Sequence, residues 1–178
     1  MACAITSGYT IDCREIAGGI QAIWVISNAN LYDASGNSRV TESSGTVTAM
    51  TKATGTRFYK FEVPRSTAVA SSNLTGSMEN GTIFYTHSVE FPINSRTATI
   101  RNTISTLAKN RLTFVTLDLD GSYRMYGKDF GLYMDSTESG SGTAPGDRQG
   151  SVLKFSSMEK DDFLIVSSSV AANLEVAG

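Results

Sequence analysis

The side chains that could perform acid–base or nucleophilic chemistry are few in this sequence. His87 is the only histidine among 178 residues, and it falls on the apolar face of an expected strand. A Ser-His-Asp arrangement would have to use it, and no Gly-x-Ser-x-Gly turn accompanies it. We therefore expect His87 to be a structural residue of the core, with pH sensing or catalysis as the alternatives. The sequence predicts no catalytic residues and a protein that is not an enzyme.

Two aspartates resemble part of a calcium-binding loop. Asp118 and Asp120 have the spacing of two ligands, but an EF-hand loop would also need an acid at position 116 and a glutamate at position 127. Those positions hold Thr116 and Gly127. An Asp-Gly pair, here Asp120 and Gly121, strongly favours a tight hairpin turn. We therefore expect a β-turn at this point and no metal site.

The two cysteines, Cys3 and Cys13, lie near the start of the sequence. In a reducing compartment they stay free thiols, and a disulfide between them is the alternative. Two thiols without a nearby histidine do not make a standard zinc site. The sequence thus predicts neither a metal nor a cofactor.

The composition is that of a globular protein with a low charge. Hydrophobic residues make up 40% of the chain and charged residues 18%, and the net charge is −2. Without a basic excess, tight binding to the phosphates of nucleic acid is not expected. No apolar run approaches the roughly 18 residues of a membrane span. The start of the sequence lacks the pattern of a secretory signal, so we expect a protein that is made and kept in the cytoplasm.

Most of the chain shows the residue types and turn signals of β-strands. We expect strands over residues 20–26, 40–50, 57–63, 112–119, 123–126, 130–134, 152–156 and 163–166, with a closing strand or tail over 167–178. One amphipathic helix is expected from about residues 93–95 to 110, with Asn94 or Ser95 as its cap. The predicted fold class is mainly β: a β-sandwich or barrel with a long hairpin and one flanking α-helix. It forms a single domain over residues 1–178, with an extended N-terminal segment and a long loop at 135–150.

The longest expected feature is a hairpin from Thr67 to Phe91, which turns at Asn80-Gly81. Its returning arm places apolar side chains on one face and mostly polar ones on the other, as in a sheet that packs on one face only. No lysine or arginine occurs between Ser66 and Pro92. An ordinary solvent-facing hairpin and the wall of a channel both fit this pattern. In the second interpretation, the residues that face the lumen are Thr82, Thr86, Ser88 and Glu90.

Three segments carry a likeness to a known family: Thr6–Arg14 with Gly18-Gly19, Met125–Leu132, and Gly140–Arg148, which leads into the strand at Val152. In these segments the chain resembles the tail tube, or major tail, proteins of tailed bacteriophages, in particular virion proteins of phages of Bacteroides-type hosts. They cover about a sixth of the chain. The order of strands, long hairpin, helix and further strands extends the resemblance.

The resemblance implies a β-sandwich flanked by a helix, assembled in rings of six copies that stack around a DNA channel. It also implies a virion tail protein that is assembled in the host cytoplasm, contacts other tail proteins and lets DNA pass without specific binding. It assigns contacts between subunits and between rings to residues 28–53 and 135–150, where Asp147 and Arg148 would form ion pairs between rings. An exposed flexible loop is the other interpretation of residues 135–150.

Two further classes of function stay open. A different virion part, such as a head–tail connector or a capsid decoration protein, would share the composition but would assemble only on another viral component. A carbohydrate-binding β-sandwich module would need exposed aromatic side chains on a concave face, and Trp24 and Tyr123 are the candidates. Because Trp24 lies inside an apolar run, we expect it in the core.

Overall fold

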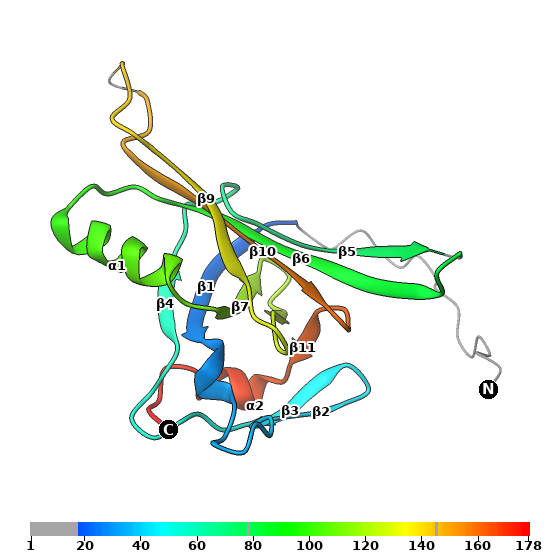
Figure 1. Ribbon diagram of the computed structural model, residues 1–178. Coiled ribbons are helices and arrows are strands. Elements are labelled where there is room, and N and C mark those ends of the chain that lie inside the picture. The colour runs from blue at the N-terminus through cyan, green and yellow to red at the C-terminus, as the bar shows by residue number, and fades with distance from the viewer. Residues whose placement is uncertain (1–17, 78, 145) are drawn as a thin grey trace.

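The strands form two sheets that pack face to face (Figure 1). The computed structural model describes residues 18–77, 79–144 and 146–178. Cys3, Cys13 and the segment Thr6–Arg14 lie outside this part of the chain. The expected mainly β fold, with a long hairpin and a flanking helix, is confirmed.

The larger sheet has seven strands in the order β2-β3-β11-β8-β7-β1-β4. Its members are β1 (Ile20–Ser27), β2 (Val40–Ser43), β3 (Thr46–Met50), β4 (Tyr59–Glu62), β7 (Leu112–Asp118), β8 (Tyr123–Tyr126) and β11 (Leu164–Val166). Neighbours are antiparallel except for β3 and β11, which run parallel.

The smaller sheet has four strands, all antiparallel, in the order β5-β6-β10-β9. Its members are β5 (Val69–Ser77), β6 (Thr82–Ile93), β9 (Tyr133–Gly140) and β10 (Gly150–Glu159). The remaining elements are a 3-10 turn, η1 (Asn28–Leu31), and the helices α1 (Ala98–Ala108) and α2 (Ser168–Ala171). Among the described residues, no helix is long and apolar enough to cross a membrane.

A cluster of phenylalanines fills the space between the two sheets. Phe91 of β6 and Phe155 of β10 stack with ring centroids 5.9 Å apart, and Phe114 of β7 approaches Phe155 to 4.9 Å from the other sheet. All three side chains are buried. Aromatic pairs of this geometry add to the stabilisation that comes from buried area alone.

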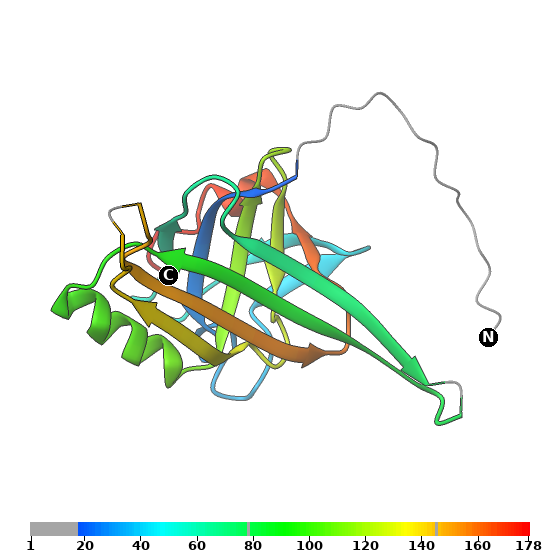
Figure 2. The ribbon, with the colours of Figure 1, turned by 90° about the horizontal axis from the view of Figure 1, so that it is seen from above.

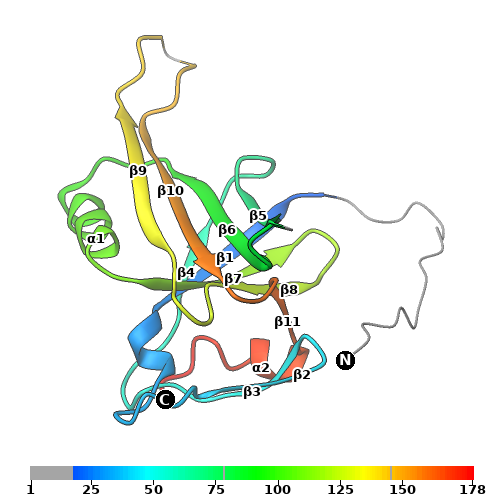
Figure 3. The same ribbon diagram turned by 45° about the vertical axis from the view of Figure 1, so that its right-hand side comes forward.

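A second apolar cluster covers the opposite face of the seven-stranded sheet. Figure 3 shows α2 and the β2–β3 hairpin on that side, away from the four-stranded sheet. The strand β1, next to the edge strand β4, contributes to both clusters: Ile23 and Val25 face the first, and Trp24 and Ile26 face the second. A strand buried on both faces has a continuous apolar sequence, which explains the run at residues 22–26.

The same double burial corrects one expectation about β7. The apolar register shift at Phe114 and Val115 suggests a bulge. In the structure both residues lie in regular pairing with β8, and each faces a different cluster. The irregularity lies in β1 instead, between Ile20 and Ala22.

The strand expected over residues 40–50 is two strands joined by a tight turn. Ser44 and Gly45 both have positive φ, at 51° and 76°. Two consecutive residues of this kind form the turn that suits a two-residue hairpin. The sheet therefore gains an additional strand at its edge.

The long loop expected at residues 135–150 is much shorter in the structure. β9 continues to Gly140, and β10 starts at Gly150 directly opposite, so the connection covers only residues 141–149. The Ser, Thr and Gly residues of β9 resemble a loop in composition, but pairing with β10 provides hydrogen-bond partners for their backbone N–H and C=O groups. The strand expected at 130–134 starts at Tyr133, because Gly131 has a φ of +73° and lies in a turn.

The helix and the C-terminal segment also differ from expectation. α1 begins at Ala98, and its cap is Thr97, whose hydroxyl accepts a hydrogen bond from the Ile100 N–H at 3.3 Å. Asn94 and Ser95 do not cap it, because β6 continues to Ile93.

The segment 167–178 is a short helix followed by turns and not a closing strand. Its end is held by Lys52, whose Nζ donates to the carbonyls of Asn173 and Val176, both at 2.6 Å.

Replacing Phe91 by alanine is expected to destabilise the domain by about 3–5 kcal/mol, because it leaves a cavity among buried rings. Denaturant unfolding followed by circular dichroism measures the change. Val176→Ala, at an exposed position, is the matched control and is expected to shift the free energy of unfolding by less than about 0.5 kcal/mol. Equal effects of the two substitutions would contradict the placement of this core.

Candidate functional site: the outer face of the four-stranded sheet

The polar arm of the long hairpin lies on the outside of the molecule. His87, Val89 and Phe91 of β6 are buried. Because successive side chains of a strand point to opposite faces, Thr86 and Ser88 point away from the core. Figure 2 shows the four-stranded sheet toward the viewer and the seven-stranded sheet behind it. The structure thus brings the four predicted lumen residues onto one face, which we call the outer face: Thr82, Thr86, Ser88 and Glu90.

The outer face is twice as wide as the hairpin, because β10 and β9 continue it. Ser88 pairs with Ser71 on one side and with Ser156 on the other. The hydroxyl oxygens of Ser71 and Ser88 are 2.9 Å apart. Ser156 was not among the residues predicted for this surface. In the sequence, apolar Leu153 and Phe155 alternate with polar Lys154 and Ser156. This alternation is the signal that could have placed Ser156 on the outward side.

The charges on the outer face nearly cancel. On the outward side of the described parts of β5, β6 and β10, the charged groups are Glu90 and Lys154. Their Oε2 and Nζ atoms are 3.4 Å apart, and both side chains are partly exposed. Such a pair contributes little to stability. It does make this part of the surface almost neutral, with Glu138 on β9 as a further acid.

The two edge strands of the four-stranded sheet, β5 and β9, have no second strand partner within the described ranges, although α1 contacts part of β9. Within the described ranges, β5 pairs only with β6, and β9 pairs only with β10. Because each strand runs opposite to its neighbour, β5 and β9 also run in opposite directions. Unpaired edges present free backbone N–H and C=O groups that can pair with another chain.

The β5–β6 hairpin extends past the rest of the sheet (Figure 2). β10 pairs with β6 only as far as Tyr85, whereas β5 pairs with it as far as Thr82. On the core-facing side of this projection, Leu74 and Ile83 are 60% and 69% exposed. The apolar face predicted for the hairpin is therefore buried at the base of the hairpin and exposed to solvent near the tip.

The loop between β9 and β10 contains the predicted contact residues Asp147 and Arg148. Asp147 Oδ2 accepts hydrogen bonds from the Thr143 N–H and the Ala144 N–H, both at 2.8 Å, and from the Thr143 hydroxyl at 3.0 Å. These bonds lower the pKa of Asp147 below its usual value. The carboxylate thus shapes its own loop. Arg148 is exposed and forms no ion pair with any described residue.

His87 is buried, as expected. Its Nδ1 accepts a hydrogen bond from the Gly127 N–H at 3.2 Å, and its ring meets Tyr126 edge to face. Desolvation lowers the pKa of His87 below 6.5, and the opposing charges of Asp162 and Asp129 do not reverse the shift. The histidine is thus held as a neutral member of the core.

A buried carboxylate near His87 was not singled out from the sequence. Glu159 accepts hydrogen bonds from the backbone N–H groups of Asp129, Phe130 and Gly131, at 3.0–3.1 Å. Burial raises the pKa of Glu159 in spite of these bonds. The Glu159 carboxylate thereby holds the backbone of the turn between β8 and β9 in place.

The calcium-like aspartates form the expected turn between β7 and β8. Arg124 forms ion pairs with Asp118 and with Asp120, the latter at 2.9 Å. Gly121 has a φ of +82°. Elsewhere in the described chain, no three His, Cys, Asp or Glu side chains are grouped so as to hold a metal ion.

The aromatic candidates for sugar binding lie in the second apolar cluster. Trp24 is 7% exposed, and its Nε1 donates to a carboxylate oxygen of Glu175 at 2.8 Å. Its ring centroid is 5.7 Å from that of Tyr123. The expected core position of Trp24 is confirmed, so its face is not available as a sugar platform.

The chain was compared with protein-family models, with curated proteins and with solved structures, and none of them matches it.

The burial of His87 predicts a pH-dependent stability. Its folded-state pKa lies below the ordinary 6.5 of the unfolded chain. The contribution of neutral His87 to the free energy of unfolding is therefore complete above pH 6.5. It is lost as pH falls toward the folded-state pKa, by at most about 1.4 kcal/mol per pH unit. In His87→Asn the side-chain oxygen can still accept the Gly127 N–H but does not titrate. The difference in unfolding free energy between wild type and variant is expected to be constant above pH 7 and to shrink below pH 6.5. Parallel curves from pH 8 to pH 5 would contradict this assignment.

Proposed function

We propose that this protein is a structural subunit that assembles into stacked rings and forms a phage tail tube, with the outer face lining its channel. The observation that carries the proposal is the four-stranded sheet itself. It has a hydroxyl-rich, nearly neutral outward surface and two open edges that run in opposite directions.

Joining these edges would close a barrel. If β9 of one copy pairs with β5 of the next, the pairing is antiparallel, and no edge remains once the ring closes. Rings of six copies are implied by the resemblance to tail tube proteins. With neighbouring strands about 4.8 Å apart, six four-stranded sheets give a circumference of roughly 115 Å before strand tilt is added.

The chemistry of the outer face suits the passage of DNA. Thr82, Thr86 and Ser88 carry no charge, and Glu90 is paired with Lys154. A surface without free basic groups does not release counterions from DNA, and so does not hold the phosphate backbone. DNA would pass along this wall without being retained.

The two ends of the four-stranded sheet supply groups for stacking. The bare tip of the β5–β6 hairpin projects at one end, and the 141–149 loop with Arg148 projects at the other (Figure 1). Exposed apolar side chains such as Leu74 and Ile83 favour association, because contact removes them from water. In the proposed tube these ends would meet the rings above and below.

Negative-stain electron microscopy of the purified chain tests the proposal directly. Rings or tubes of uniform width with a central hole are the expected result. Monodisperse monomers at high protein concentration would overturn it. Assembly only after another viral component is added would instead indicate a connector or a decoration protein.

Lysines at positions 86 and 88 test the lining of the channel. Thr86→Lys/Ser88→Lys tubes are expected to bind short DNA duplexes at low salt and to release them as salt rises, because each lysine adds a phosphate contact. Fluorescence polarisation with labelled duplexes measures the binding. Ser105→Lys/Ala108→Lys, on the exposed side of α1, is the control with the same added charge. If the control binds DNA as well as the test variant, the hydroxyl face does not line the channel.

A further inference from the structure

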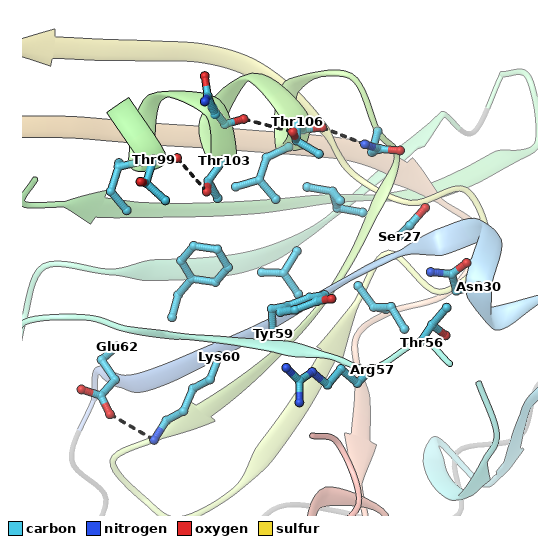
Figure 4. Close-up of a pocket in the computed structure, with 18 of the residues that line it drawn as sticks. Ser27, Asn30, Thr56, Arg57, Tyr59, Lys60, Glu62, Thr99, Thr103 and Thr106 are labelled. Carbon is cyan, nitrogen blue, oxygen red and sulfur yellow. Dashed lines mark hydrogen bonds and ion pairs between the residues drawn. The ribbon is translucent and has the colours of Figure 1, made fainter. Parts of the chain in front are cut away.

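A groove lies between α1 and β4 (Figure 4). Its volume is about 930 Å³. Apolar side chains, including Val25, Phe61 and Leu107, lie along it, and Figure 4 shows Tyr59 pointing into it from β4 and Thr103 facing it from α1. Its size and its mixture of apolar and hydroxyl groups are typical of a binding site and not of a packing defect.

One wall of the groove is an unpaired strand edge. β4 is the last strand of the seven-stranded sheet and pairs, within the described chain, only with β1. Tyr59 of β4 is exposed, and its ring lies below the guanidinium of Arg57 at 5.5 Å. An edge of this kind can accept an extended peptide as an additional strand, with main-chain hydrogen bonds for affinity and pockets for alternate side chains.

We propose that this groove binds residues 4–14 of a second copy of the chain, added as a strand to the free edge of β4. The site thus takes an extended peptide whose side chains alternate between apolar and polar.

Residues 9–13 have this character. Tyr9, Ile11 and Cys13 alternate with the polar residues Thr10 and Asp12. Such a two-residue period favours a strand with one apolar face, and β-branched and aromatic residues suit it. The segment also contains no proline that would remove a backbone donor. Its apolar side would lie against Phe61 and Leu107.

The path of the chain into β1 favours a second copy over the same chain. The carbonyl of Gly19 accepts a hydrogen bond from the Leu119 N–H at 2.9 Å, and Ile20 pairs with Asp118. The chain therefore enters β1 on the side of β7, whereas β4 lies on the other side of β1. Seventeen residues can extend by up to about 55 Å, which is enough to reach a neighbouring molecule.

Cross-linking between two differently marked full-length variants tests the proposal. One variant, Cys3→Ser, keeps Cys13 as its only thiol. The other, Cys3→Ser/Cys13→Ser/Thr103→Cys, has its only thiol in the groove. The control replaces Thr103→Cys by Ser105→Cys on the exposed side of the same helix. The variants are mixed, treated with a short bismaleimide and separated by denaturing electrophoresis.

A heterodimer several-fold more abundant with the groove thiol than with the control thiol is the expected result. Equal yields from the two positions would overturn the groove as the binding site. A single variant with Cys3→Ser and Thr103→Cys carries both Cys13 and the groove thiol. If its cross-link forms only within one chain, the bound segment comes from the same chain, and the proposed exchange between copies is wrong.

The inference stands apart from the proposed tube. Heterodimers without rings in the microscope would support strand exchange and contradict the tube. Rings without heterodimers would support the tube and contradict strand exchange.

Discussion

The alternation of side chains along β6 is the constraint on which the rest of the molecule depends. His87, Val89 and Phe91 are buried against the other sheet, so their neighbours must face outward. A shift of one residue in the register of β6 would turn its core-facing side chains outward and its outward side chains into the core. The two surfaces of the strand therefore cannot change independently. The phenylalanine core thus fixes which hydroxyls form the outer face. Packing in the interior and the polarity of the surface are set by the same register.

The two sheets differ in how much of their surface other elements cover. The seven-stranded sheet is covered on both faces, and one end of it stops at β4 beside the α1 groove. Among the described residues, the four-stranded sheet packs against the other sheet on one face, and neither β5 nor β9 has a second strand partner. Within the described chain, four strands pair with one neighbour only: β2, β4, β5 and β9. Because unpaired edges promote pairing with other chains, such edges would serve the proposed assembly. The polar outer face and the open edges therefore support the same kind of function.

The sequence predicted those features that depend on local patterns. The two faces of the hairpin, the turn at Asp120-Gly121 and the buried position of Trp24 follow from residues close together in the chain. β9 could not be predicted in this way. Its Asp, Glu and Gly residues have weak strand propensity, and pairing with β10 makes the segment a strand. Strand stability that comes from pairing with another strand leaves little trace in local composition.

The candidate site shows the same division between local and distant signals. Alternation along β6 puts Thr86 and Ser88 opposite the buried His87 and Val89, and their position in a channel stays a prediction. Ser156 and Lys154 join the same face through pairing with residues more than 60 positions away. Asp147 illustrates the opposite case: a charge expected at an interface is used within its own loop. Arg148, beside it, keeps its charge exposed. In the proposed tube, the guanidinium of Arg148 would pair with a carboxylate of a neighbouring ring. Because Asp147 already holds Thr143 and Ala144 by hydrogen bonds, these residues would lose less conformational entropy if this end of the sheet formed the proposed contact.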